Sequence, residues 1–221
     1  MANVERQSTL AMKREAAKKR ERPRYGAKRE AILKAAGLVL ERNGFAGTTI
    51  EAIAREAGLD RATVYYYFSD KGAIFRAAIH DGLTDMVKSL EEVAGSDEQP
   101  EARLRSSIRA VMRSFERYYP TLYIYLRSGD SATVIDDDLN QELIDSGRRY
   151  EDLVERVVRY GVTEGVFNTS LPPKVFAKSV TGMLNWTSHW FVPGGMLTAD
   201  DVADGMADMV LSGVLPRKTR V

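Results

Sequence analysis

The chain has 221 residues, with 32 Lys or Arg and 31 Asp or Glu, so its formal net charge is only +1. It has no cysteine, which excludes disulfides and thiolate chemistry and fits a reducing cytoplasm, where we expect the protein to be located. Hydrophobic residues make up 44% of the chain, which is enough for a sizeable core. The sequence contains no run of about 20 apolar residues, so we expect no membrane-spanning helix. The N-terminus lacks the apolar run of a signal peptide, so we expect none.

Positive charge is concentrated at the N-terminus. Residues 1–29 contain ten Lys or Arg and three Glu, whereas the remainder of the chain is net acidic. A basic segment on an acidic body indicates a polyanionic partner for that end. Residues 1–24 also offer few apolar side chains that could hold a helix against a core, so we expect a basic, flexible arm. The alternative is a solvated tail without a partner.

The periodicity of apolar residues predicts helices along the rest of the chain. The first begins near Lys28 and ends at the Asn43-Gly44 stop signal. The other expected helices are 49–58, 60–68, 71–93, 101–119, 121–127, 139–164, 173–191 and 199–214. No alternating strand pattern is convincing, so the fold class is predicted to be all-α. We expect a three-helix domain at 25–72 and a larger helical domain at 73–216.

Residues 49–68 combine two short helices with a turn that contains Gly58. Thr48 or Thr49 can cap the first of these helices, and Asp60 begins the second. Two short helices joined in this way are typical of a helix-turn-helix, whose second helix enters the major groove of DNA. We therefore expect a nucleic-acid interface on the second helix.

The side chains of this second helix suit DNA. Arg61 can read guanine with its guanidinium fork or hold a phosphate, while Ala62 and Thr63 permit close approach to base edges. A tyrosine hydroxyl can donate to a phosphate oxygen, and Lys71 adds its charge to free backbone N–H groups at the start of the next helix. Of the three consecutive tyrosines, Tyr67 is expected to be the most buried.

The segment from Arg29 to Ile79 resembles the DNA-binding domain of TetR-type transcriptional regulators. The resemblance rests on the paired threonines, the Ile-Ala followed by a Gly, the Thr-apolar-Tyr-x-Tyr-Phe helix and the Lys after it, within TTIEAIAREAGLDRATVYYYFSDKGAIFRAAI. Ala52 departs from the pattern, because many members have Asp there. The resemblance implies a homodimer that binds a palindromic double-stranded DNA operator. The expected DNA-binding residues are Thr48, Thr49, Arg61, Ala62, Thr63, Tyr65, Tyr66, Tyr67 and Lys71.

By the same resemblance, residues 73–216 form an effector-binding and dimerisation domain. Residues 186–215, with a Trp-x-x-x-Trp pair and a Pro-Gly-Gly turn, resemble the branch that regulates lipid and steroid catabolism and senses acyl-CoA thioesters. This implies a repressor that a small hydrophobic effector releases from DNA. The alternative is a regulator of a drug-efflux or stress operon that responds to a different lipophilic ligand.

The aromatic residues of this domain are candidates for an apolar effector pocket. The expected pocket residues are Phe115, Tyr119, Tyr123, Met183, Trp186 and Trp190. Basic groups that could face the phosphates of coenzyme A are Arg127, Arg148, Arg149, Lys174 and Lys178. Two helices near the C-terminus are expected to form a four-helix interface between subunits. The expected interface residues are Val180, Leu184, Thr187, Val202, Met206, Met209 and Val210.

An enzyme is the main alternative from another class. The chain has only two histidines, His80 and His189, and it has no nucleophile elbow and no cluster of potential metal ligands. We therefore expect no catalytic residue, no metal and no cofactor. A non-specific architectural DNA binder would explain the basic arm but not the large aromatic-rich C-terminal domain.

Overall fold

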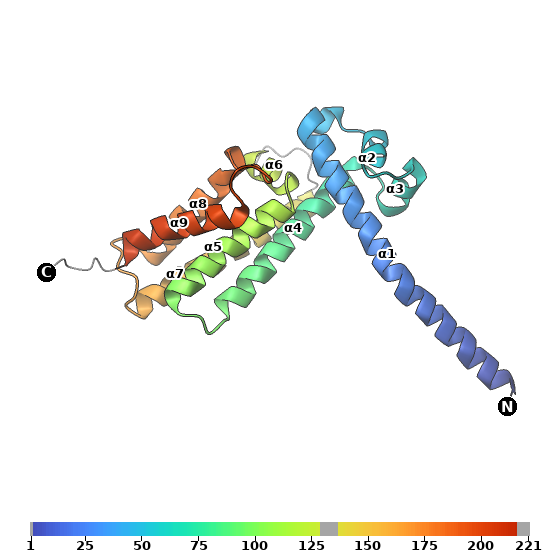
Figure 1. The fold of residues 1–221 in the computed structure, drawn as a ribbon, viewed down its shortest axis with the longest axis horizontal. Helices are drawn as coiled ribbons and strands as arrows, with labels where there is room; N and C mark the ends of the chain where they lie inside the picture. The colour runs from blue at the N-terminus through green and yellow to red at the C-terminus, as the bar shows by residue number, and fades with distance from the viewer. Residues whose placement is uncertain (1, 129–136, 216–221) are drawn as a thin grey trace. The chain divides into compact units, whose positions relative to one another are not determined.

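The computed structural model describes residues 2–128 and 137–215, with side chains for residues 25–127 and 141–215. In these ranges all regular structure is helical, which confirms the all-α prediction (Figure 1). The chain divides into two compact units, Met1–Ile74 and Phe75–Val221, close to the expected boundary after residue 72. None of the helices in the described part is long and apolar enough to cross a membrane.

The first unit contains α1 (Ala2–Gly47), α2 (Ile50–Glu56) and α3 (Arg61–Tyr67). The backbone of α1 is helical well before Lys28, where the apolar periodicity begins, because Ala, Lys and Arg are good helix formers. Gly44 interrupts this helix with a φ of 66°, a left-handed conformation that glycine adopts without strain. The predicted stop at Asn43-Gly44 is therefore confirmed.

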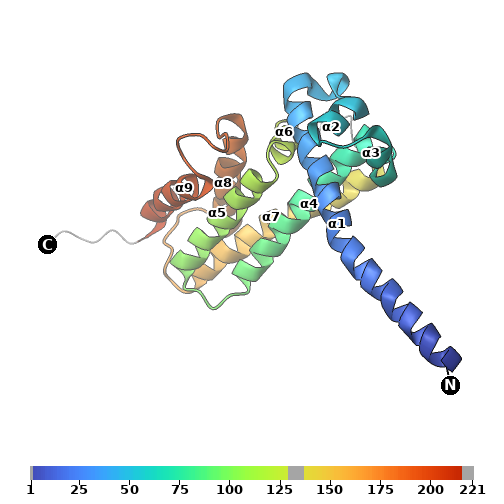
Figure 2. The ribbon, with the colours of Figure 1, turned by 45° about the vertical axis from the view of Figure 1, so that its right-hand side comes forward.

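The apolar faces of these three helices meet in one small core. Ile32 of α1, Ile53 of α2 and Val64 of α3 are each fully buried. Complete burial of such a side chain contributes about 1.5–3 kcal/mol to folding. Figures 1 and 2 both show α2 and α3 beside the C-terminal part of α1. This packing decides which side of α3 remains free.

Side-chain caps fix where the short helices begin. The Thr49 hydroxyl accepts the backbone N–H three residues later at 3.1 Å, and the carboxylates of Asp60 and Asp70 accept the corresponding N–H groups at 2.7 and 2.8 Å. Of the two threonines considered as the N-cap of α2, Thr49 has this position. The cap at Asp60 sets the rotation of α3 and hence the direction of its side chains.

The second unit is built from the greater part of α4 and from all later helices. These are α4 (Lys71–Ala94), α5 (Pro100–Arg117), α6 (Thr121–Ser128), α7 (Asp137–Thr163), α8 (Pro173–Trp186), the 3-10 turn η2 (Thr187–His189) and α9 (Ala199–Val214). Within this unit α5 packs against α7 and α9, and α7 packs against α8 (Figure 1). Buried Ala203 and Ala207 let α9 approach α5 closely. The helix expected over 173–191 ends at Trp186, where η2 begins.

Candidate nucleic-acid interface and effector region

The exposed side of α3 carries the residues expected to meet DNA. Arg61, Ala62, Tyr65 and Tyr66 are exposed, and Tyr66 is the most exposed of the three tyrosines at 75%. Tyr67 is half-buried, which confirms the expected ranking, and burial raises the pKa of its hydroxyl. α3 therefore presents a continuous polar and aromatic surface while its buried side holds it in the unit.

Neighbouring side chains orient the polar residues of this surface. The Arg61 guanidinium lies 2.8 Å from the Glu51 carboxylate of α2 and 3.5 Å from the Tyr65 hydroxyl. Tyr65 and Glu51 both raise the pKa of Arg61. The Thr63 hydroxyl donates to Asp60 at 2.9 Å, and hydrogen bonds from Thr63 lower the pKa of Asp60. The Arg61 side chain is thus held at the start of α3 as a cation.

The prediction that Thr48 contacts DNA is wrong. Its side chain is buried, with 1% exposed, and its hydroxyl donates to the Gly44 carbonyl at 2.8 Å. Lys71 lies over the same loop, where its ammonium donates to the carbonyls of Phe45 and Thr48 at 2.8 and 3.0 Å. Both side chains stabilise the connection between α1 and α2. A phosphate contact by Lys71 stays a prediction.

Three of the expected pocket residues form one aromatic cluster in the second unit. The ring of Tyr123 lies 5.2 Å from Phe115 and 5.7 Å from Tyr119, in edge-to-face geometry. The Tyr123 hydroxyl lies 3.0 Å from the Thr187 hydroxyl, and burial raises its pKa to about 12. Phe191 completes the cluster at 6.5 Å from Tyr123. Phe191 is not among the expected pocket residues, because it follows two more conspicuous tryptophans in the sequence.

The exposure of several residues in α8 and in the turn that follows it differs from the prediction. The expected interface residues Val180, Leu184 and Thr187 are buried in the core of their own subunit. The expected pocket residues Trp186 and Trp190 are instead exposed, at 62% and 49%. The interface assignment of the three buried residues is therefore wrong, whereas the pocket assignment of Trp186 and Trp190 stays a prediction. When a helix has apolar residues on two sides, its sequence does not show which side packs into the core of the subunit.

α9 shows the same distinction between a core face and an outer face. Val202 is buried and cannot contribute to a subunit interface in this conformation, so its assignment is also wrong. Met206 and Val210 are half-buried, whereas Met209 is 70% exposed. The exposed apolar residues Val175, Trp186 and Met209 belong to the outer faces of α8 and α9. We name these three residues the outer α8–α9 face.

At least two polar grooves lie among the described residues of the second unit. A groove of about 550 Å³ between α4 and α5 is lined by charged residues and serines, among them Asp85, Ser89 and Arg117. A groove of about 330 Å³ between α7 and α8 includes Arg148 and Lys178 together with Lys174. It thus brings together three of the five basic residues considered for phosphate binding. Glu151, Asp152 and Glu155 line the same groove and balance that charge, so the groove does not favour a phosphate.

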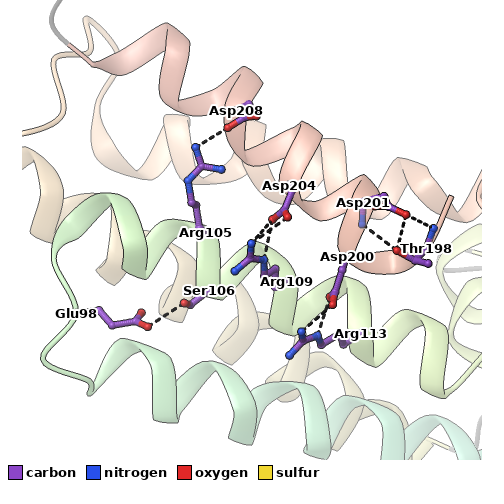
Figure 3. Close-up of polar contacts among 10 residues, drawn as sticks. All are labelled: Glu98, Arg105, Ser106, Arg109, Arg113, Thr198, Asp200, Asp201, Asp204 and Asp208. Carbon is purple, nitrogen blue, oxygen red and sulfur yellow. Dashed lines mark hydrogen bonds and ion pairs between the residues drawn. The ribbon is translucent and has the colours of Figure 1, made fainter.

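A ladder of ion pairs joins α5 to α9, as Figure 3 shows. Its pairs, in antiparallel order, are Arg105–Asp208, Arg109–Asp204 and Arg113–Asp200. The second and third pairs each have two hydrogen bonds of 2.7–2.9 Å between guanidinium and carboxylate. Thr198 and Asp201 form a capping box at the start of α9. The ion pairs hold α9 against α5, and the capping box fixes where α9 begins.

Comparisons with known proteins agree with this architecture. The family model "Bacterial regulatory proteins, tetR family" matches residues 32–78, and "Tetracyclin repressor-like, C-terminal domain" matches residues 97–214. The HTH-type transcriptional repressor KstR2 of Mycobacterium tuberculosis is 22% identical over 188 residues, which cover 85% of this chain and 92% of KstR2.

Solved structures share the fold. A TetR family regulator, PfmR from Thermus thermophilus, has a TM-score of 0.72 at 28% identity, over 82% of this chain and 97% of that chain. A structure of AibR in complex with isovaleryl coenzyme A and operator DNA has a TM-score of 0.65 at 24% identity, over 82% of this chain and 97% of AibR.

A helix-turn-helix unit followed by a larger helical domain defines a DNA-binding regulator with a ligand-binding domain. The chain belongs to the TetR family of transcriptional regulators, since separate models of that family match both of its parts. The matched proteins are regulators and not enzymes, which decides against the catalytic alternative. Among the described residues, no group of His, Asp or Glu is arranged to hold a metal ion.

Proposed function

We propose that this regulator is a repressor that binds a palindromic operator as a homodimer and is released by an acyl-CoA thioester. The observation that carries the DNA-binding part is the exposed side of α3, with Arg61 and Tyr66 directed away from the core of their unit. An exposed recognition helix with a cation and several hydroxyls has the groups needed for base edges and phosphates.

The outer α8–α9 face supports the homodimer. Val175, Trp186 and Met209 are 45%, 62% and 70% exposed, and a Cβ placed on Gly182 or Gly205 would meet no described atom within 4 Å. A second copy could therefore approach these helices closely and form a four-helix interface. A two-fold dimer places two recognition helices about one turn of DNA apart, roughly 34–36 Å, on a palindromic site.

The aromatic cluster around Tyr123 is the proposed effector site. It combines apolar rings with the hydroxyls of Tyr123 and Thr187, the mixture of groups that small-molecule sites contain. Tyr123 is fully buried in this conformation, so an effector that enters must open the cluster. Opening then favours a conformation of lower DNA affinity, typically by about 5- to 150-fold. The CoA thioester class is suggested by the AibR complex with isovaleryl coenzyme A.

Fluorescence anisotropy tests both parts of the proposal. A duplex is first selected from a random-sequence library by the wild-type chain. Arg61→Ala should weaken its binding at least tenfold, whereas the control Arg55→Ala, an exposed change on α2, should have little effect. If Arg61→Ala binds like the wild type, α3 is not the reading helix.

The effector is tested by titrating CoA thioesters, beginning with isovaleryl-CoA, into the protein–DNA complex. A thioester should release the duplex, while free coenzyme A and isovalerate should not. Tyr123→Ala should abolish this response, and the control Tyr160→Phe, which removes a hydroxyl but keeps the ring under Arg103, should retain it. Release by a cationic drug or a free acid, with no effect of any CoA thioester, would show that the effector class is wrong.

A further inference from the structure

A third tyrosine ring, from α1, joins two rings of the recognition helix. The Tyr25 ring lies 4.6 Å from Tyr67 and 6.4 Å from Tyr66, and the latter two rings lie 5.2 Å apart. Two of these contacts are edge-to-face, with interplanar angles of 75° and 82°. These separations and angles are those of favourable aromatic pairs. The three residues form what we name the tyrosine cluster.

Tyr25 is not required by the core of its unit. It is 46% exposed and precedes Ile32, which is the first fully buried residue of α1 from residue 25 onward. Its aromatic neighbours among the described residues are the two tyrosines of α3. Both Tyr25 and Tyr66 also contribute to the raised pKa of Tyr67, as expected for three neighbouring hydroxyl-bearing rings. The contacts of Tyr25 thus lie on the surface proposed to meet DNA and not in the hydrophobic interior.

We propose that Tyr25 is a positioning residue for DNA recognition. Its ring restricts the rotamers of Tyr66 and Tyr67, so that their hydroxyls reach the duplex without first losing conformational entropy. It also fixes the point at which the basic N-terminal segment leaves the helix-turn-helix unit relative to α3. The DNA-binding surface therefore extends from α3 onto α1. This inference rests on the proposed operator binding.

The test compares Tyr25→Phe with Tyr25→Ala on the selected duplex and on a scrambled duplex, at a temperature at which melting curves show each variant to be folded. Tyr25→Phe keeps the ring and should bind within about twofold of the wild type. Tyr25→Ala should bind the selected duplex about tenfold more weakly, the loss expected for one or two aromatic contacts. Its effect on the scrambled duplex should be smaller.

Double variants separate positioning from general weakening. The double variant Tyr25→Ala/Tyr67→Ala should lose less affinity for the selected duplex than the product of the two single fold-losses, because each change removes the same ring contact. For the double variant Tyr25→Ala/Tyr65→Ala, the fold-losses of affinity should simply multiply. The Tyr65 hydroxyl and ring contact Arg61, so this change removes a different contact. The second pair is thus a matched control on the same helix.

Three results would overturn the inference. If Tyr25→Ala binds like the wild type, the cluster has no role in recognition, although the proposed function stands. If Tyr25→Phe binds as weakly as Tyr25→Ala, the hydroxyl is itself a DNA ligand and positioning is wrong. If the wild-type chain selects no duplex, the proposed operator binding fails and the inference fails with it.

Discussion

Thr48 and Thr49 are neighbours in the sequence, yet their hydroxyls serve different parts of the fold. Thr49 caps α2 and is exposed, whereas the buried Thr48 hydroxyl donates to the Gly44 carbonyl. The capping preference of threonine is the same at both positions, so the sequence left both as candidates. The left-handed turn at Gly44 decides between them, because the carbonyl of Gly44 accepts a hydrogen bond from the Thr48 hydroxyl.

Thr48→Val therefore tests a structural role. Valine keeps the shape of the buried side chain but removes the hydrogen bond to the Gly44 carbonyl, so the free energy of unfolding should fall by about 1 kcal/mol. Urea denaturation measures this change. DNA affinity of the folded protein should be unaffected. A tenfold loss of affinity in fully folded Thr48→Val would instead return Thr48 to the DNA interface.

Two glycines of α7, Gly161 and Gly147, allow a test of how this helix is packed. A Cβ on Gly161 would lie 2.1 Å from the buried Phe167 ring, whereas a Cβ on Gly147 would meet no described atom within 4 Å. Gly161→Ala should destabilise the protein by about 1–3 kcal/mol through overpacking. Gly147→Ala should stabilise it by roughly 0.5–1 kcal/mol, since alanine favours a helix. Equal effects in thermal or chemical unfolding would contradict the packing of Phe167 on α7.

At the scale of elements, the ladder makes the attachment of α9 sensitive to acid. Hydrogen bonds from Arg113 and Arg109 lower the pKa values of Asp200 and Asp204 from the ordinary 3.8. Because the folded pKa is the lower one, the stabilisation is complete above pH 4 or so and is lost as pH falls through the folded values. The melting temperature should therefore decrease below about pH 4.

The double variant Asp200→Asn/Asp204→Asn checks this dependence. It should melt at a lower temperature than the wild type at neutral pH, with a smaller further decrease in acid. Asp97→Asn, an exposed change outside the ladder, is the control. If the difference in melting temperature between the wild type and the double variant stays the same from pH 7 to pH 3, the ladder does not contribute to acid sensitivity.

The helices were largely predictable, while their orientation was not. Capping residues, glycines and prolines mark helix ends locally, and the observed bounds of α3, α4 and α9 fall within a residue of the expected ones. Which side of α8 is buried depends on the position of α7 and η2, which are distant constraints that periodicity does not contain. For this reason the burial of Leu184 and the exposure of Trp186 were not foreseen, and neither was the contact of Tyr25 with α3, from which it is distant in the sequence.

For the whole molecule, a palindromic operator requires two copies, and the outer α8–α9 face is the proposed contact. Trp186→Ala removes its largest exposed side chain and should raise the dimer dissociation constant about 30-fold or more, as expected when a large aromatic side chain is lost from an interface. Analytical ultracentrifugation measures this constant. Leu171→Ala, an exposed apolar change just before α8, should leave it unchanged. A dimer that is equally stable with Trp186→Ala would place the interface elsewhere.

The equal spacing of the ladder has a consequence for how α9 finds its place. Arginines and aspartates both recur every four residues, so a displacement of α9 by one helical turn would pair Arg109 with Asp208 and Arg113 with Asp204. Charge alone thus permits more than one register of α9 on α5. Ala207 and Leu211 lie on the buried side of α9, and the displacement would put a leucine in the place of a fully buried alanine, which overpacks the core. Long-range attraction therefore brings α9 to α5, and the difference of one side-chain volume selects a single register.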